Sequence, residues 1–185
     1  MKALVTGGAG FVGSNLADRL IELGHEVVII DNLSTGKKEN INNKAEFIGK
    51  CLTSLEEDFL IGKGIDVVFH LAALARVQPS IEDPINFNEH NVTATVKLLY
   101  ACHRAKIKRV VYSASSSAYG DATEFPTPET HPINPLSPYG LQKLIGEQYC
   151  KMFSEVYGLD TCSLRYFNVY GERMNLTGAY CLVMG

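Results

Sequence analysis

The stretch Thr6-Gly7-Gly8-Ala9-Gly10-Phe11-Val12-Gly13 decides the fold expected of this chain. It follows the apolar run Ala3-Leu4-Val5, which predicts a short buried strand, and precedes Ser14–Leu23, whose apolar residues recur at helical spacing. Its glycines satisfy both Gly-x-Gly-x-x-Gly and Gly-x-x-Gly-x-x-Gly. Such glycines permit a tight turn, let backbone N–H groups approach a pyrophosphate and let the helix pack against the strand. A glycine turn between a strand and a helix is the setting that a dinucleotide-binding motif requires.

An acidic residue follows at the distance that this motif predicts. Asp31 ends the β-branched run Glu26–Ile30, roughly 20 residues after the turn, where a carboxylate accepts hydrogen bonds from an adenosine ribose. A carboxylate at this position repels a 2′-phosphate, so the sequence favours NAD over NADP. The alternative interpretation is a structural glycine turn with a solvated aspartate.

Strands and helices alternate along the rest of the chain. The expected strands are Ala3–Val5, Glu26–Ile30, Phe47–Ile48, Asp66–Leu71, Arg109–Ser113 and Thr161–Arg165. The expected helices are Ser14–Leu23, Asn86–Ala105 and a helix that begins after Ser137 and ends at Gly158. Alternation of this kind, with nearly continuous apolar strands, indicates a parallel sheet covered on both faces. We therefore expect an α/β fold with a doubly wound parallel sheet of the Rossmann type, without internal repeats or linkers.

A tyrosine and a lysine stand four residues apart at the start of the last helix. Ser137 and Pro138 are typical of an N-cap and a first helical residue, so Tyr139 and Lys143 fall on one helix face. A lysine ammonium beside a phenol lowers the phenol's pKa, which makes Tyr139 a candidate base near neutral pH. An ordinary exposed helix pair is the alternative for this common spacing.

Composition excludes several classes of protein. The 185 residues are 46% hydrophobic and 20% charged, with a net charge of -3, which is ordinary for a globular domain and gives no basic surface for nucleic acid. No segment has the length of a membrane span, and the five histidines show no metal-ligand spacing. Five dispersed cysteines without a Cys-x-x-Cys pair favour a reduced, cytoplasmic protein, with Cys150 and Cys162 expected in the core.

Further segments stand in a fixed order between Met1 and Gly171. They are Asp31-Asn32-Leu33-Ser34-Thr35-Gly36, His70-Leu71-Ala72-Ala73, Asn91, Ser115-Ser116-Ser117-Ala118-Tyr119-Gly120 and Arg165-Tyr166-Phe167-Asn168-Val169-Tyr170-Gly171. With the glycine turn and the Tyr139/Lys143 pair, the chain resembles the extended short-chain dehydrogenase/reductases. Within them it is most similar to the NAD-dependent epimerase/dehydratase family, in the branch typified by UDP-glucose and UDP-N-acetylglucosamine 4-epimerases.

The resemblance implies a role for each matching position. The residues implied to bind the cofactor NAD are Gly7, Gly10, Phe11, Val12, Gly13, Asp31, Asn32, Leu71, Ala72, Ala73, Asn91, Tyr139 and Lys143. Ser115, Tyr139 and Lys143 are the implied catalytic residues. Ser115, Ser116 and Asn168 are the implied contacts to a nucleotide-sugar, although Ser116 and Ser117 as plain loop hydroxyls remain an alternative.

The implied reaction is reversible oxidation at one sugar carbon. Tyr139, assisted by Ser115, would remove the C4 hydroxyl proton while the C4 hydride passes to NAD, and return of the hydride to the other face would invert the carbon. Dehydratases of the family carry Asp-Glu after the catalytic threonine, where this chain has Ser116 and Ser117, so an epimerase is favoured. The alternatives are a dehydratase or reductase of the same superfamily and a non-catalytic NAD-binding module.

Several expectations concern the ends and surfaces of the chain. Lys50-Cys51-Leu52 lacks the acidic residue that relatives usually place near the adenine, and Gln142 stands where serine or threonine is commoner. The resemblance implies an NAD-binding domain over 1–171 and the start of a shortened substrate-binding region over 172–185. It consequently implies a sheet left incomplete with exposed apolar surface, and an epimerase that binds NAD but turns over slowly or not at all. It also implies a homodimer through the helices Asn86–Ala105 and Tyr139–Tyr157, with neither membrane nor nucleic-acid partners.

Overall fold

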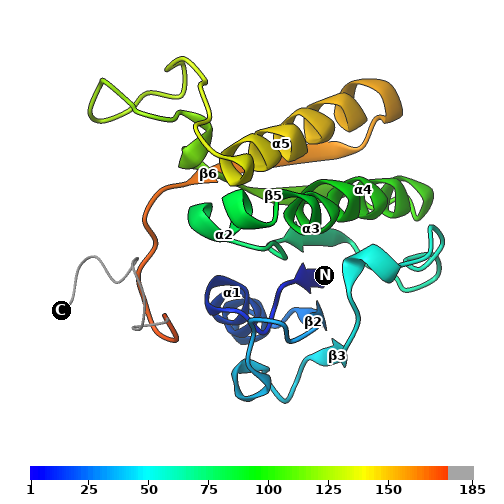
Figure 1. Ribbon diagram of the computed structural model, residues 1–185. Helices are drawn as coiled ribbons and strands as arrows, with labels where there is room; N and C mark the ends of the chain where they lie inside the picture. The colour runs from blue at the N-terminus through cyan, green and yellow to red at the C-terminus, as the bar shows by residue number, and fades with distance from the viewer. Residues whose placement is uncertain (175–185) are drawn as a thin grey trace.

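Six parallel strands form a single sheet in the computed structural model, which describes residues 1–174 (Figure 1). The strands are β1 (Lys2–Thr6), β2 (Glu26–Ile30), β3 (Glu46–Ile48), β4 (Val67–His70), β5 (Arg109–Ser115) and β6 (Asp160–Tyr166). Their order is β3-β2-β1-β4-β5-β6, and every neighbouring pair is parallel. The predicted α/β fold with a Rossmann-type sheet is confirmed.

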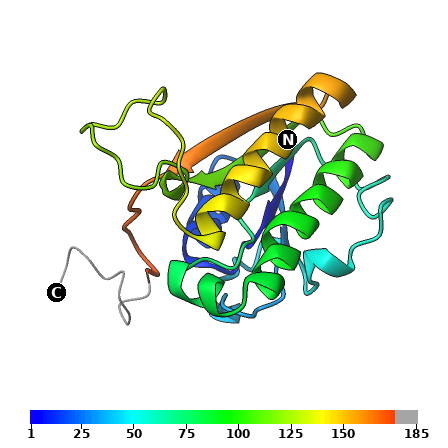
Figure 2. The same ribbon diagram turned by 45° about the horizontal axis from the view of Figure 1, so that its top comes forward.

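Helices cover both faces of this sheet. They are α1 (Phe11–Glu22), α2 (Val77–Glu82), α3 (Pro84–Asn88), α4 (Ala94–Arg104) and α5 (Pro138–Tyr157). Three single turns of 3-10 helix occupy Lys38–Asn40, Leu52–Ser54 and Ser116–Ala118. Figures 1 and 2 show α4 and α5 side by side on one face of the sheet, with α1 on the other.

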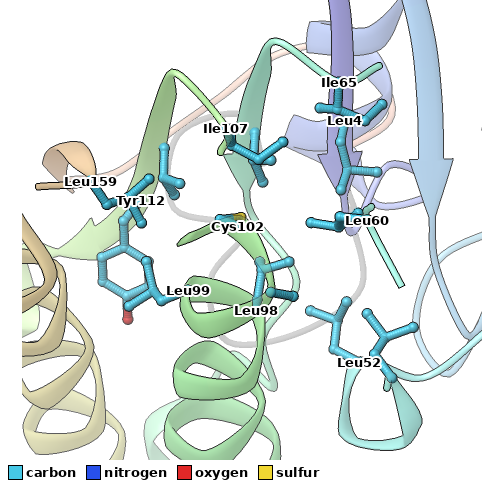
Figure 3. Close-up of a cluster of buried hydrophobic side chains, with 14 of the residues drawn as sticks. Leu4, Leu52, Leu60, Ile65, Leu98, Leu99, Cys102, Ile107, Tyr112 and Leu159 are labelled. Atoms are coloured by element: carbon cyan, nitrogen blue, oxygen red, sulfur yellow. The ribbon is translucent and has the colours of Figure 1, made fainter. Parts of the chain in front are cut away.

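Alternate residues of each strand point into two separate cores. Leu4, Val68 and Val110 belong to the larger core, which also holds Leu98, Leu99 and Cys102 of α4 (Figure 3). Ala3, Val5, Val27 and Ile29 point the other way and pack with Ala17 and Leu20 of α1. Because both faces of the central strands are buried, their sequences read as unbroken apolar runs.

The strand order reverses between β1 and β4. From β1 the chain first builds β2 and β3 on one side and then returns to build β4, β5 and β6 on the other. The loops that leave the carboxyl ends of β1 and β4 therefore diverge, and the crevice between them is where open α/β sheets bind ligands.

Two helices differ from the sequence prediction. Helix α1 begins at Phe11 rather than Ser14, because Gly10 is extended (φ -79°, ψ 176°) and the glycine at position 13 is already helical. The expected helix Asn86–Ala105 is interrupted by a π-helical turn at Glu89–Thr93, between α3 and α4. The short helix α2 was not predicted, since six residues are too few for helical periodicity to show.

The outer strand β6 is more exposed than its sequence suggested. Cys162 is exposed, so its expected place in the core was wrong, whereas Cys150 is buried as expected. Leu164, also on β6, is 40% exposed. The physical reason is that, among the strands within residues 1–174, β6 is the last in the sheet order and pairs with β5 alone. Most of the expected region 172–185 lies outside the described residues.

Candidate active site

The glycine turn after β1 is shaped by close backbone contacts. Gly7 has φ +71°, and a Cβ atom there would lie 2.8 Å from the backbone nitrogen of Ala72. A Cβ at Gly13 would collide with the carbonyl oxygen of Gly7. Only glycine tolerates both the left-handed conformation and this proximity. The turn thus brings the start of α1 against β1 and against the loop after β4.

Asp31 is fixed by backbone amides at the end of β2. Its Oδ2 accepts a hydrogen bond from Ala9 N at 3.0 Å and its Oδ1 accepts one from Leu33 N at 2.8 Å. The residue is buried. Each carboxylate oxygen can accept a second bond, so the oriented carboxylate retains capacity for ligand hydroxyl groups. The neighbouring Asn32 Oδ1 accepts from Ser34 N at 3.0 Å.

Asn91 clamps the loop that follows β4. Its Oδ1 accepts from Leu74 N at 2.8 Å, and its Nδ2 donates to Leu74 O at 3.0 Å and to Gln142 Oε1 at 3.1 Å. Asn91 is buried and lies in the π-helical turn, and π-turns are frequent at functional sites. Gln142 continues the network by donating to Pro84 O at 3.4 Å. The unusual Gln142 therefore links α5 to α3 and to the clamped loop.

Ser115 ends β5 beside the 3-10 turn Ser116–Ala118. Its Oγ accepts from Ser117 N at 3.2 Å and donates to Ser117 Oγ at 3.1 Å. Ser115 is buried, with 8% of its surface exposed. Ser117 thus holds the Ser115 hydroxyl group at the carboxyl end of the sheet.

Two serine side chains cap the N-terminus of helix α5. Ser137 Oγ accepts from Gly140 N at 3.1 Å, and Pro138 occupies the first helical position, as predicted. The backbone N–H of Tyr139 donates to Ser80 Oγ of α2 at 3.1 Å. Because first-turn N–H groups have no partner within their own helix, Ser80 serves as an additional cap from a different element.

Lys143 is buried one turn further along α5. Its Nζ lies 4.8 Å from the ring centroid of Tyr112, a cation–π distance, and only 4% of the residue is exposed. Burial lowers the pKa of Lys143 to about 8. The ammonium form therefore still predominates near neutral pH, as the base assignment of Tyr139 requires. The Tyr112 hydroxyl group also donates to Lys143 O at 3.4 Å.

One cavity of about 410 Å³ joins these parts. The predicted site residues that line it are Gly7, Gly10, Phe11, Val12, Gly13, Asp31, Asn32, Leu71, Ala72, Ala73, Ser115, Tyr139 and Lys143. Residues that the sequence reasoning did not assign also line it, among them Ser34, Thr35, His90 and Phe167. Ser34 and Thr35 could have been found from their place in the segment that begins at Asp31. His90 and Phe167 carry no local signal.

The family of this chain is shown by comparison with known proteins. The sequence profile described as the NAD dependent epimerase/dehydratase family matches residues 3–181. The chain belongs to this family. No group of three or more possible metal-ligating side chains occurs within residues 1–174. No helix among these residues has the length and apolarity needed to cross a membrane.

Relatives from this family resemble the chain throughout its length. A Methanocaldococcus jannaschii protein provisionally named a UDP-glucose 4-epimerase is 46% identical over 177 residues, which is 95% of this chain and 58% of that protein. The UDP-N-acetylglucosamine 4-epimerase of Methanobrevibacter ruminantium, solved with UDP-N-acetylmuramic acid, superposes with a TM-score of 0.92 at 44% identity. That match covers 98% of this chain and 59% of the solved one.

A third relative was solved with a dinucleotide. The UDP-glucose 4-epimerase of Thermus thermophilus in complex with NAD has a TM-score of 0.90 at 36% identity, covering 97% of this chain and 59% of that one. The chain thus spans less than two thirds of the length of these family members.

Three residues assigned from the family resemblance do not line the cavity. Asn91 is buried behind its wall and acts on it through Leu74. Ser116 begins the 3-10 turn beside Ser115, and Asn168 is exposed in the segment after β6. The residues on either side of Asn168, Phe167 and Val169, do line the cavity.

Proposed function

We propose that this chain binds NAD as the cofactor-binding part of a nucleotide-sugar 4-epimerase, acting on a UDP-hexose or a UDP-N-acetylhexosamine. The cofactor fits the residues present. The backbone at Gly7 and Gly13 leaves no room for a side chain, and the first turn of α1 lines the cavity at Phe11 and Val12. Helix N-termini of this kind bind pyrophosphate through backbone N–H groups.

The adenosine end of the cofactor is assigned to Asp31 and Asn32. The Asp31 carboxylate is oriented by Ala9 N and Leu33 N and retains acceptor capacity for two ribose hydroxyl groups. Its negative charge disfavours a 2′-phosphate, which supports NAD over NADP. Lys50 and Cys51 line the same cavity.

The single observation that carries the catalytic proposal is the common cavity of Ser115, Tyr139 and Lys143 with the glycine turn. The bound nicotinamide would supply the acceptor and donor of a hydride. Tyr139 takes the proton of a sugar hydroxyl group, and the buried Lys143 ammonium stabilises the phenolate. Ser115 donates to the sugar oxygen as its charge develops. Once the other face of the keto carbon is turned toward the nicotinamide, which would return the hydride and so invert that carbon, Tyr139 returns the proton to the sugar oxygen.

Epimerisation is favoured over dehydration by the residues after Ser115. Elimination of water needs an acid and a base beside the sugar, whereas Ser116 and Ser117 are hydroxyl groups that do not ionise near neutral pH. Ser117 is moreover hydrogen-bonded to Ser115 through both its N–H and its Oγ. Ser117 therefore orients the Ser115 hydroxyl group.

The domain assignment, the location and the remaining partners belong to the same proposal. Residues 1–171 form the cofactor domain and 172–185 begin the substrate region, with Ser116 and Asn168 as nucleotide-sugar contacts. Cys51, Cys102, Cys150 and Cys162 are free thiols, which supports a reduced, cytoplasmic setting. We further assign α4 and α5 to a homodimer interface.

Calorimetry of the 185-residue chain with NAD and NADP tests the cofactor assignment. We expect binding of NAD, weaker binding of NADP, and weaker NAD binding by Asp31→Asn, with no loss of folding. Equal affinity for both dinucleotides, or no binding of either, would contradict the proposal.

Chromatography of UDP-glucose/UDP-galactose and UDP-N-acetylglucosamine/UDP-N-acetylgalactosamine incubated with NAD-loaded protein tests the reaction. Interconversion of either pair supports a 4-epimerase. An unsaturated or deoxy product indicates a dehydratase. Release of one reduced cofactor for each oxidised sugar indicates a dehydrogenase, which is a reductase of the same superfamily running in the direction of sugar oxidation. NAD binding with no reaction of any nucleotide-sugar supports the non-catalytic module.

A further inference from the structure

A line of buried hydrogen bonds crosses the molecule behind the cofactor cavity. Thr6 Oγ1 of β1 lies 2.8 Å from His70 Nδ1, and His70 Nε2 of β4 lies 2.9 Å from Thr95 Oγ1 of α4. All three residues are at most 1% exposed. None of them lines the cavity, yet each neighbours a residue that does.

The hydrogen bond at the Thr95 end determines the direction of the other hydrogen bonds in this line. Thr95 Oγ1 donates its single proton to Asn91 O at 2.7 Å, so it accepts from His70 and the proton lies on Nε2. His70 Nδ1 is then an acceptor, and the Thr6 hydroxyl group donates a hydrogen bond to it. Only the neutral imidazole with its proton on Nε2 satisfies all of these groups at once.

The orientation of the Thr6 hydroxyl group matters to the loop after β4. With its proton directed to His70, Thr6 Oγ1 presents its lone pairs to the N–H groups of Leu71 and Ala72, each at 3.2 Å. Leu71 and Ala72 line the cavity opposite the glycine turn. There the Gly7 backbone approaches Ala72 so closely that a Cβ atom would be 2.8 Å from its nitrogen.

We propose that His70 is a positioning residue, whose neutral Nε2–H imidazole orients Thr6 so that the loop Leu71–Ala72 is held against the glycine turn. The proposal assigns no contact between His70 and any ligand. The position of the loop follows from contacts within this chain alone, whereas the effect on cofactor affinity rests on the proposed function.

One charged and one aromatic side chain lie close to the His70 ring, and the charged one favours its neutral form. Lys143 of α5 carries a positive charge, and the Tyr112 ring of β5 lies with its centroid 5.6 Å from that of His70. Burial, and next the Lys143 charge, lower the pKa of His70 to about 3. The hydroxyl groups of Thr6 and Thr95 complete its surroundings from β1 and α4.

Nitrogen-15 NMR of the histidine side chain tests the hydrogen-bond direction. We expect His70 to show the neutral Nε2–H tautomer, unchanged between mildly acidic and neutral pH. A Nδ1–H tautomer, or an imidazolium at neutral pH, would overturn the proposal whether or not the protein binds NAD.

Hydrogen exchange at the Ala72 amide tests the positioning role. Thr6→Val has nearly the same shape but removes the acceptor, so we expect exchange at Ala72 to quicken at least about tenfold, while Thr6→Ser retains protection. His70→Leu should behave like Thr6→Val, because Thr6 then loses its oriented partner. Val68→Ala is the matched control for general loosening of the core, because Val68 lies on the same strand and the same face as His70. Equal exchange in Thr6→Val and Thr6→Ser would refute the role.

Titration of the same variants with NAD separates this inference from the proposed function. We expect Thr6→Val and His70→Leu to bind NAD about tenfold more weakly than Thr6→Ser and Val68→Ala at matched thermal stability. Unchanged affinity in Thr6→Val counts against the proposal. If the unaltered chain fails to bind NAD, the proposed function fails, while the tautomer and exchange experiments still decide the role of His70.

Discussion

At the scale of single residues, the site combines charge with burial. Lys143 is buried with its ammonium over the Tyr112 ring, and His70 stays neutral close by. The tyrosine–lysine spacing is visible in the sequence, and it predicted a lysine able to tune a tyrosine. The near-complete burial of Lys143 was not visible there, because it depends on β5 and α5 packing together.

Lys143→Met should stabilise the protein near neutral pH. The pKa of Lys143 falls from 10.5 to about 8 on folding, so below about 8 a charge is buried at a cost of about 3 kcal/mol. The unfolded chain binds more protons between about 8 and 10.5, so the unaltered protein gains stability as pH rises through that window. Urea unfolding across this range should show the advantage of Lys143→Met shrinking with pH. A constant advantage would contradict the assignment.

Tyr139→Phe should separate chemistry from binding. The phenylalanine ring keeps the shape of the site but has no ionisable group, so oxidation of the sugar should slow by at least about 10²-fold. NAD should still bind, with at most a modest loss of affinity in calorimetry, because Tyr139 is one of many residues that line the cavity. Rapid epimerisation by this variant would show that Tyr139 is not the base.

At the scale of elements, the best-predicted parts are those with local chemical signals. The last helix was predicted to begin after Ser137 and to end at Gly158, and α5 does so, with Gly158 in the left-handed region (φ 67°). Strand β2 also has the predicted bounds. The π-helical turn at Glu89–Thr93 was missed, because its cause is tertiary: it lies where Asn91 holds Leu74 of another segment.

Two serines cap α5 through different amides, and their replacement should be distinguishable. Ser137→Ala removes the local cap of Gly140, and Ser80→Ala removes the acceptor that α2 offers to Tyr139. Each change should destabilise the protein by about 1 kcal/mol. Hydrogen exchange should quicken at the Gly140 amide in the first variant and at the Tyr139 amide in the second. The same pattern in both variants would argue against separate caps.

At the scale of the whole molecule, apolar side chains are exposed on the outer face of α5. On α5, residues at helical spacing include Leu141 and Val156, which are 47% and 67% exposed. Tyr100 of α4, the helix that lies beside α5, is half-buried. Exposed apolar surface of this kind favours burial against a second copy.

The chain should therefore sediment as a dimer at micromolar concentration, and Val156→Asp should shift it toward a monomer. Ser154→Asp, which adds the same charge at an exposed position off the stripe, is the matched control and should leave the dimer intact. A monomer in the unaltered protein would refute the interface assigned to α4 and α5.

The sequence by itself determined the alternation of strands and helices along the chain, the glycine turn, Asp31, and the four-residue spacing of Tyr139 and Lys143. These are properties of neighbouring residues, whose backbone preferences and spacing act locally. The tertiary structure alone decided that Ser115 and the glycine turn share a cavity, that Asn91 acts through Leu74, and that Cys162 is exposed on β6. It also joined Thr6, His70 and Thr95 into one oriented line. Contacts between distant segments depend on how the sheet is ordered and covered, and no local pattern records that order.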